Sequence, residues 1–151
     1  IVLVRHVERC DHSKAACLND REGITARARA VAVGRGARIE QLGLGNADLD
    51  TSPRVRAAQT AGYMFNNVGT GDSSLINCRH DLLRTALAHN VARRNLILVT
   101  HSERMHAMES AIQRPTSALR EAASVCVSTA RRQAPRVLGL IEADDTLPVR
   151  C

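Results

Sequence analysis

Apolar residues occur along the chain in short runs separated by longer amphipathic stretches, a pattern typical of alternating strands and helices. The short runs are predicted to be strands and cover residues 1–4, 49–51, 75–76, 95–100, 125–129 and 137–141. The longer stretches are predicted to be helices and cover residues 26–42, 53–64, 80–92 and 103–113. This alternation predicts a single α/β domain over residues 1–151, a three-layer sandwich with a mostly parallel central sheet.

Residues at the predicted helix ends agree with this pattern. Thr25 is a predicted N-cap of the first helix, because its hydroxyl can accept a hydrogen bond from an orphan backbone N–H group. Gly43 is predicted to end that helix, since glycine adopts the left-handed conformation of a C-terminal cap easily. Pro53 is predicted at the first position of the second helix, where its missing N–H costs little. Residues 66–74 contain several turn signals and are predicted to be a loop.

Two of the predicted strands end at a histidine. Arg5-His6 follows the first apolar run, and His101 follows the run at 95–100. Ligands of open α/β sheets bind beyond the carboxyl ends of the strands, so we expect both histidines to meet at one edge. A single histidine at a strand end is more often structural, whereas two of them with nearby arginines indicate an anion-binding site.

Composition narrows the class of protein. Hydrophobic residues make up 44% of the chain and charged residues 24%, which are globular proportions. No apolar stretch approaches the roughly 20 residues of a membrane helix, so no membrane span is expected. The net charge of +6 favours an anionic partner. With one Tyr, one Phe and no Trp, the chain lacks the aromatic residues that stack on nucleic-acid bases, and no nucleic-acid partner is expected.

The segment Leu3-Val4-Arg5-His6-Val7-Glu8 resembles the first-strand signature of the histidine phosphatase superfamily, which has the phosphoglycerate-mutase-like fold. Later segments resemble further motifs of that family in the same order. Gly23-Ile24-Thr25 is similar to its "LT" helix start, the run from Ser52 to Ala61 to its "SSPLxRAxQTA" segment, and Leu98-Val99-Thr100-His101-Ser102 to its late strand ending in "SHG". The resemblance spans residues 1–112 and implies a phosphatase that acts on a small phosphorylated substrate.

The resemblance also implies a role for each motif residue. A neutral His6 attacks phosphorus and becomes a phosphohistidine. Arg5 and Arg56 clamp the phosphoryl oxygens, since a guanidinium fork matches phosphate geometry. His101, expected to be protonated, donates to the same oxygens, and the backbone N–H of Ser102 at a helix start adds an anion contact. Neither a metal nor a cofactor is expected, because these residues already supply positive charge.

Several neighbouring residues have two interpretations. Arg54 is the alternative to Arg56, but it lies about 200° away around a helix, and the family register favours Arg56. Arg9 either reaches a second anionic group of the substrate or pairs with Asp11. Glu8 is expected near the pocket rim as a structural partner or a proton handler.

The proton donor for the leaving oxygen departs from the family pattern. The family register places the acid at Asn77, which cannot donate a proton as a carboxylic acid does. Asp81, one helical turn further on, is the substitute candidate. Without a working acid, the chain would be a catalytically weakened phosphate or phospho-sugar binding protein, which is the main alternative to an enzyme. A basic nucleic-acid module is a third alternative, whose affinity would fall steeply with salt.

The segments Arg5–Asp11 and Cys17–Asp20 are similar to a periplasmic branch of the superfamily that includes lipopolysaccharide core heptose phosphate phosphatases. That resemblance implies a periplasmic or secreted setting in which disulfides persist, with Cys10 and Cys17 able to close a short loop. Cys126 is equally well interpreted as a buried thiol, and Cys10-Asp11-His12 is a weak metal-ligand alternative. Because the chain begins in a strand without Met or a signal peptide, we expect that a leader has been removed.

Overall fold

The structure is a computed structural model, and it describes residues 1–77, 81–112, 123–129 and 134–141. In the described part, a six-stranded sheet has the strand order β3-β2-β4-β1-β5-β6. The strands are β1 (Val2–Arg5), β2 (Ala47–Thr51), β3 (Thr70–Gly71), β4 (Asn95–Thr100), β5 (Ser124–Ser128) and β6 (Arg136–Ile141). Strands β3, β2, β4 and β1 run parallel, whereas β5 pairs antiparallel with β1 and β6 antiparallel with β5.

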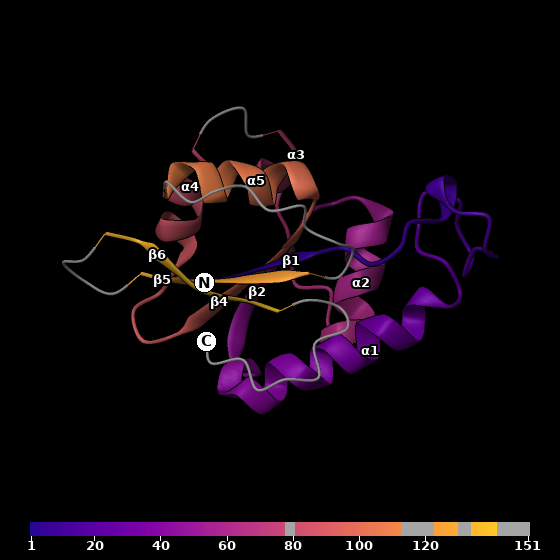
Figure 1. Ribbon diagram of the computed structural model, residues 1–151, viewed down its shortest axis with the longest axis horizontal. Helices are drawn as coiled ribbons and strands as arrows, with labels where there is room; N and C mark the ends of the chain where they lie inside the picture. The colour runs from indigo at the N-terminus through magenta and orange to yellow at the C-terminus, as the bar shows by residue number, and fades with distance from the viewer. Residues whose placement is uncertain (78–80, 113–122, 130–133, 142–151) are drawn as a thin grey trace.

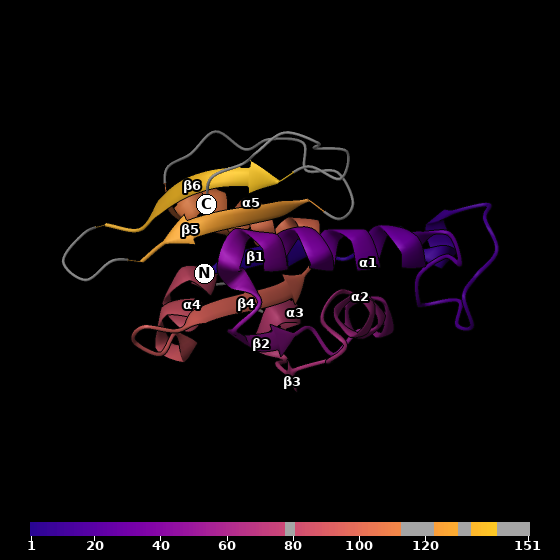
Figure 2. The ribbon, with the colours of Figure 1, turned by 90° about the horizontal axis from the view of Figure 1, so that it is seen from below.

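Helices cover both faces of this sheet (Figure 1). They are α1 (Ala28–Ile39), α2 (Val55–Phe65), α3 (Ser74–Asn77), α4 (Leu82–His89) and α5 (Ser102–Ala111), with a 3-10 turn at Cys10–His12 and a π-helical turn at Glu40–Leu44. Helices α1 and α2 pack on one face of the sheet, and α4 and α5 pack on the other (Figure 2). The predicted three-layer α/β architecture is confirmed, with an antiparallel edge.

Each face of the sheet has its own hydrophobic core, because successive residues of a strand point to opposite faces. Val2 and Val4 of β1 pack with apolar residues of α1 and α2, whereas Leu3 packs with residues of α4 and α5. Strands β1 and β4 are therefore buried on both sides, as their continuous apolar runs predict. No helix in the described residues is long and apolar enough to cross a membrane.

Helices α1 and α2 each begin two residues later than predicted. Helix α2 begins at Val55, with Arg54 as its N-cap, instead of at Pro53. The Ser52 backbone N–H still donates to the Val99 carbonyl oxygen at 2.9 Å, so the extended segment continues past β2 before the helix starts. Helix α1 begins at Ala28, but Thr25 still acts near its start, since its hydroxyl accepts from the Ala28 N–H at 3.3 Å.

The segment between α2 and α4 also differs from its prediction. Leu75 and Ile76 lie in helix α3 instead of a strand, and the short strand β3 falls inside the predicted loop. The Asp72 carboxylate accepts hydrogen bonds from both the backbone N–H and the hydroxyl of Ser74, at 2.8 and 2.6 Å, and so favours a helical turn there. As predicted, the helical segment after α1 ends near Gly43, whose φ of 78° is left-handed.

Candidate active site

The two histidines at the strand ends lie next to each other. Strands β1 and β4 are parallel neighbours with Arg5 opposite Thr100, so His6 and His101 follow at the same edge of the sheet. The His6 backbone N–H donates to the Thr100 carbonyl oxygen at 3.1 Å. The imidazole rings are buried, with centroids 5.2 Å apart and planes inclined by 61°. The predicted convergence of His6 and His101 is therefore confirmed.

The hydrogen bonds of His6 fix the position of its proton. Nδ1 lies 2.8 Å from the Val7 carbonyl oxygen, which can only accept, so Nδ1 carries the proton in the neutral ring. Burial lowers the pKa of His6 to about 3, with smaller contributions from the nearby His101 and Arg56. Nε2 consequently has a free lone pair at neutral pH. The Val7 backbone N–H donates to the Thr60 hydroxyl at 3.2 Å, which holds this turn against α2.

His101 lies at the N-cap of α5, immediately after β4. Its Nε2 is 2.8 Å from the hydroxyl oxygen of Ser52. Burial, followed by the positive charge of Arg56, lowers the pKa of His101 to about 4. The expectation of a protonated His101 is therefore wrong for the free protein at neutral pH, because the ring is too buried and too close to a guanidinium.

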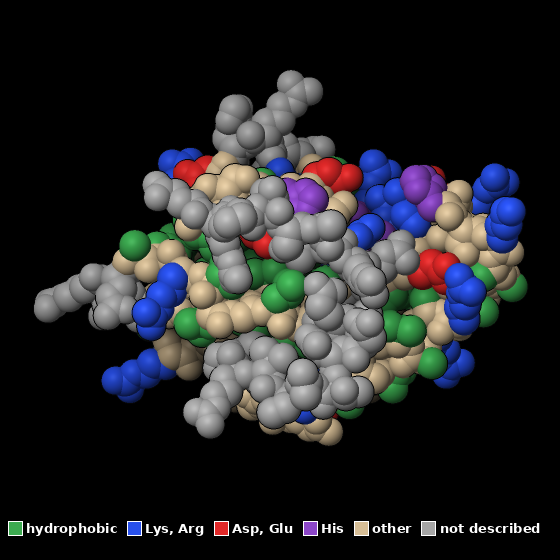
Figure 3. Space-filling view, viewed as in Figure 1, with side chains coloured by type: hydrophobic (Ala, Val, Ile, Leu, Met, Phe, Trp, Pro, Cys, Tyr) green, Lys and Arg blue, Asp and Glu red, His purple; other side chains and the backbone are tan. Residues whose placement is uncertain are grey.

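Basic side chains gather at this end of the sheet, where β1 leads into the loop before α1 (Figure 3). Arg5 is the last residue of β1, and Arg56 lies in the first turn of α2. The positive charges of both guanidinium groups lower the pKa of His6, and their role as a phosphate clamp stays a prediction. Arg54, the alternative to Arg56, is exposed but also acts on His101. Ser102 begins α5 directly after His101.

Arg9 pairs with Asp11, as one of its two interpretations predicts. Its Nε donates to the Asp11 carboxylate at 2.6 Å, and a second guanidinium nitrogen donates to the other oxygen. This pairing with Arg9 lowers the pKa of Asp11 to about 2. The Cys10–Cys17 disulfide, with 5.2 Å between the Cα atoms, closes the same loop as the resemblance implies. A metal site at Cys10-Asp11-His12 is excluded, because the disulfide removes the thiolate. Cys126 is also disulfide-bonded, so its interpretation as a free thiol is wrong.

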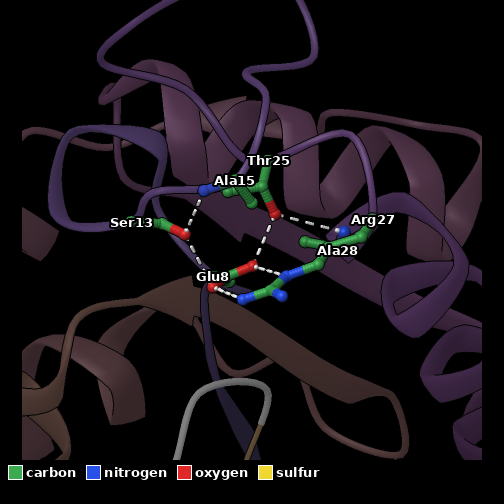
Figure 4. A network of polar contacts seen from close by, with 6 residues as sticks. All are labelled: Glu8, Ser13, Ala15, Thr25, Arg27 and Ala28. Carbon is green, nitrogen blue, oxygen red and sulfur yellow. Dashed lines mark hydrogen bonds and ion pairs between the residues drawn. The ribbon is translucent and has the colours of Figure 1, made fainter.

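Glu8 ties this loop to the start of α1 (Figure 4). Its carboxylate accepts from the Ser13 hydroxyl at 2.9 Å, from the Thr25 hydroxyl at 2.7 Å and from Arg27 Nε at 2.7 Å, and a second Arg27 nitrogen completes a bidentate ion pair. Arg27, and then Thr25, lower the pKa of Glu8 to about 2, so the group is ionised. The contacts favour the structural alternative for Glu8 over proton transfer.

Replacing Glu8 with glutamine is expected to lower the free energy of unfolding by about 1–3 kcal/mol, because the amide loses the charge-assisted bonds to Arg27 and cannot accept at both atoms. Urea unfolding at pH 7 measures this change. The predicted kcat for an aryl phosphate stays within about twofold of the parent value. A loss of kcat above tenfold without a loss of stability would instead assign Glu8 to proton transfer.

Asp81, the proposed acid, has a capping role at the start of α4. Asp81 is the N-cap of α4, where its carboxylate accepts from the Arg84 N–H at 2.9 Å, and its side chain is 53% exposed. Within the described residues, no hydrogen bond or ion pair joins Asp81 to His6 or His101. The side chain of Asn77, where the family register places the acid, lies outside the described part. Asp81 as the proton donor stays a prediction.

A second polar cluster lies at the β2–β3 edge of the sheet. His89 Nδ1 is 2.9 Å from the Asp50 carboxylate and 3.7 Å from that of Asp72. One nitrogen or oxygen atom of each of these side chains lies within 4.8 Å of the other two, so the three groups form one polar cluster. His89, in helix α4, is 42% exposed and lies at the surface.

Two residues of the site, Ser52 and Thr60, were not among the predicted site residues. Both belong to the segment that resembles "SSPLxRAxQTA", and both are fully buried with their hydroxyl groups directed to the histidine turns. For Ser52, the available signal in the sequence was its position directly after the predicted strand at 49–51, because residues that follow parallel strands gather at one sheet edge. The segment therefore supplies the site with two hydroxyl groups that contact the histidine turns, in addition to Arg56.

Comparison with known proteins gives relatives that are phosphatases, although no protein-family model matches the chain. A lipopolysaccharide core heptose(II)-phosphate phosphatase from Salmonella choleraesuis is 32% identical over 109 residues, covering 68% of this chain and 52% of that protein. A corresponding phosphatase from Shigella flexneri is 31% identical over 112 residues, covering 70% and 54%. The chain thus spans about half the length of the curated relatives it matches.

Solved structures show the same fold. The protein histidine phosphatase SixA complexed with tungstate superposes with a TM-score of 0.72 at 10% identity, covering 94% of this chain and 96% of that one. A mycobacterial glucosyl-3-phosphoglycerate phosphatase superposes with a TM-score of 0.65 at 15% identity, covering 91% and 96%. Together with the paired histidines and the matched motifs, these comparisons show that the chain belongs to the histidine phosphatase superfamily.

Proposed function

We propose that the chain is a phosphomonoesterase that forms a phosphohistidine on His6. The observation that carries the proposal is the His6 hydrogen bond to the Val7 carbonyl oxygen at 2.8 Å, which leaves Nε2 as an unprotonated nucleophile. Nε2 forms a bond to phosphorus while the bond from phosphorus to the ester oxygen breaks, and that oxygen takes a proton from an acid, for which Asp81 is the candidate. Water then attacks phosphorus, the phosphorus–nitrogen bond breaks, and inorganic phosphate leaves.

The groups around His6 are suited to stabilise the transferring phosphoryl group. Within the described part of the chain, Arg56 Nε and His101 Nδ1 are buried and have no hydrogen-bond partner. Buried donors without partners are rare in folded proteins, so an anion that accepts from them is favoured. Arg5, Arg56 and His101 would thereby supply fixed donors where charge develops in the transition state.

Substrate class and location follow from the relatives and remain part of the proposal. The matched Salmonella and Shigella proteins are named for a phosphate on heptose of the lipopolysaccharide core. A phosphorylated sugar of this kind is the substrate we propose, with action in the periplasm. The Cys10–Cys17 disulfide supports an oxidising compartment. The second candidate, a phosphate-binding protein with weak catalysis, is favoured by the use of Asp81 as a helix cap.

Turnover of an aryl phosphate ester between pH 4 and 8 tests the proposal. We expect release of inorganic phosphate and a phosphoenzyme that is labile in acid and stable in base, as a phosphorus–nitrogen bond requires. The phosphorylated residue can be assigned to His6 by mass spectrometry of peptides prepared at high pH. If phosphate protects the protein against heat but neither turnover nor a phosphoenzyme is found, the weakened binding protein is correct.

A further inference from the structure

Ser52 is buried, and among the described residues the side-chain hydrogen bond of its hydroxyl is with His101. It is fully buried, and its backbone N–H donates to the Val99 carbonyl oxygen of β4 at 2.9 Å. Its hydroxyl oxygen lies 2.8 Å from Nε2 of His101, which is 8% exposed. The extended segment after β2 thus places one hydroxyl group against one nitrogen of the His101 ring.

The direction of this hydrogen bond decides what His101 offers to an anion. A neutral imidazole has one donor nitrogen and one acceptor nitrogen. If the Ser52 hydroxyl donates to Nε2, the ring proton is on Nδ1, and Nδ1 is a donor. If Nε2–H donates to Ser52 instead, Nδ1 presents a lone pair to the phosphoryl oxygens and repels them.

Hydrogen-bond accounting favours the first direction. Within the described residues, the Ser52 hydroxyl has no acceptor other than Nε2, so the opposite direction would leave its proton buried and unpaired. Nδ1 of His101 is also buried and has no partner there, and a bound phosphoryl oxygen would satisfy an Nδ1–H group. With the His101 proton on Nδ1, the Ser52 hydroxyl donates to Nε2 and the Nδ1–H group donates to the bound anion, so both donors are paired.

We propose that Ser52 is a positioning residue that donates its hydroxyl hydrogen to Nε2 of His101 and keeps the His101 proton on Nδ1, facing the phosphoryl oxygens. For activity this inference rests on the proposed phosphatase function. It explains how His101 serves as an anion donor without being protonated. The Ser52 hydrogen bond matters most near neutral pH, because a neutral imidazole carries one proton and the hydrogen bond decides which nitrogen holds it.

The charges around His101 come from every side of the site. His6 and Arg9 lie after β1, Arg54 and Arg56 belong to the start of α2, and Glu103 belongs to α5. Arg56, Arg54 and Arg9 disfavour the imidazolium, whereas Glu103 favours it. Removing Ser52 alters none of these charges, so a pH effect of its replacement reports on the hydrogen bond.

Nitrogen-15 NMR of the histidine rings tests the proposal without requiring turnover. At pH 7 we expect the parent protein to have the His101 proton on Nδ1, and Ser52→Ala to have it shared between both nitrogens. Inorganic phosphate is expected to bind about tenfold more weakly to Ser52→Ala, the loss of roughly one well-formed hydrogen bond. Ser52→Thr retains the hydroxyl and should restore affinity to within about threefold.

The pH dependence separates positioning from a merely structural role. Below about pH 4 an imidazolium donates from both nitrogens, so the ratio of phosphate affinities between parent and Ser52→Ala should shrink toward one as the pH falls from 7 to 4. Ser124→Ala, which removes another fully buried hydroxyl, is the matched control. Its affinity for phosphate should equal that of the parent protein at every pH between 7 and 4.

Two results would overturn the inference. One is a parent protein with the His101 proton on Nε2, and the other is an affinity ratio that does not change with pH. These readouts use ring nitrogens and phosphate binding, so they remain decisive even if the protein turns over no ester. Conversely, a phosphohistidine on His6 combined with an unaffected Ser52→Ala variant would support the proposed function and refute the role of Ser52.

Discussion

Replacing His6 with alanine is expected to reduce turnover of an aryl phosphate ester by at least about 1,000-fold, because removing a nucleophile abolishes the covalent route. The same replacement should abolish the acid-labile phosphoenzyme. Arg5, Arg56 and His101 remain in place, so the variant should still bind inorganic phosphate. Steady-state kinetics, rapid acid-free quenching and calorimetric titration with phosphate measure these three quantities.

His89→Ala is the matched control for this replacement. His89 is 42% exposed and pairs with Asp50 and Asp72, and no hydrogen bond joins it to His6 or His101 within the described residues. Its removal should leave kcat within about twofold of the parent value. If His6→Ala and His89→Ala retain equal turnover, the nucleophile is a different group and the phosphohistidine mechanism is wrong.

The pairing of His6 with His101 was predictable from the chain because it depends on a rule of topology. The two apolar runs that end at a histidine form β1 and β4, which are parallel neighbours in the sheet. The carboxyl ends of parallel strands lie at the same edge of a sheet. The structure adds that β1 and β4 are direct neighbours in the sheet, which brings the two rings into contact. The disulfide between Cys10 and Cys17 could be anticipated for a different reason, because the two residues are only seven positions apart in the chain.

The segment around Leu75 shows where local pattern fails. Two apolar residues fit a strand or a helical turn equally well, and the capping contacts of Asp72 decide in favour of α3. Pro53 misled the prediction for a different reason. A proline suits a helix start, but the pairing of Ser52 with Val99 keeps the chain extended two residues longer.

The protonation states could not be predicted from the sequence because they depend on contacts between distant residues. Ser52 and His101 are 49 positions apart, and their hydrogen bond forms only when β2 and β4 pair. Burial of both rings, which lowers their pKa values, likewise arises from helices on either face. Residue types reveal the chemistry that is available, whereas packing decides which form of each group is present.

Stability is expected to fall strongly as the pH is lowered from 7 to 5. His6 and His101 have folded-state pKa values of about 3 and about 4, below the ordinary value of 6.5. Between those values the unfolded chain binds protons that the folded protein does not, so the free energy of unfolding decreases with falling pH. At roughly 1.4 kcal/mol per pH unit for each histidine, the loss reaches about 4 kcal/mol by pH 5.

A loss of this size is a large part of the 5–15 kcal/mol typical of a folded domain, so urea unfolding at pH 7, 6 and 5 should detect it readily. Glu8 and Asp11 do not contribute in this window, since their lowered pKa values of about 2 affect stability only below about pH 4.5. The double variant His6→Ala/His101→Ala should lose most of the slope, whereas His12→Ala should retain it. An equal slope in the double variant would show that other groups take up the protons and that the two rings are not held neutral by burial.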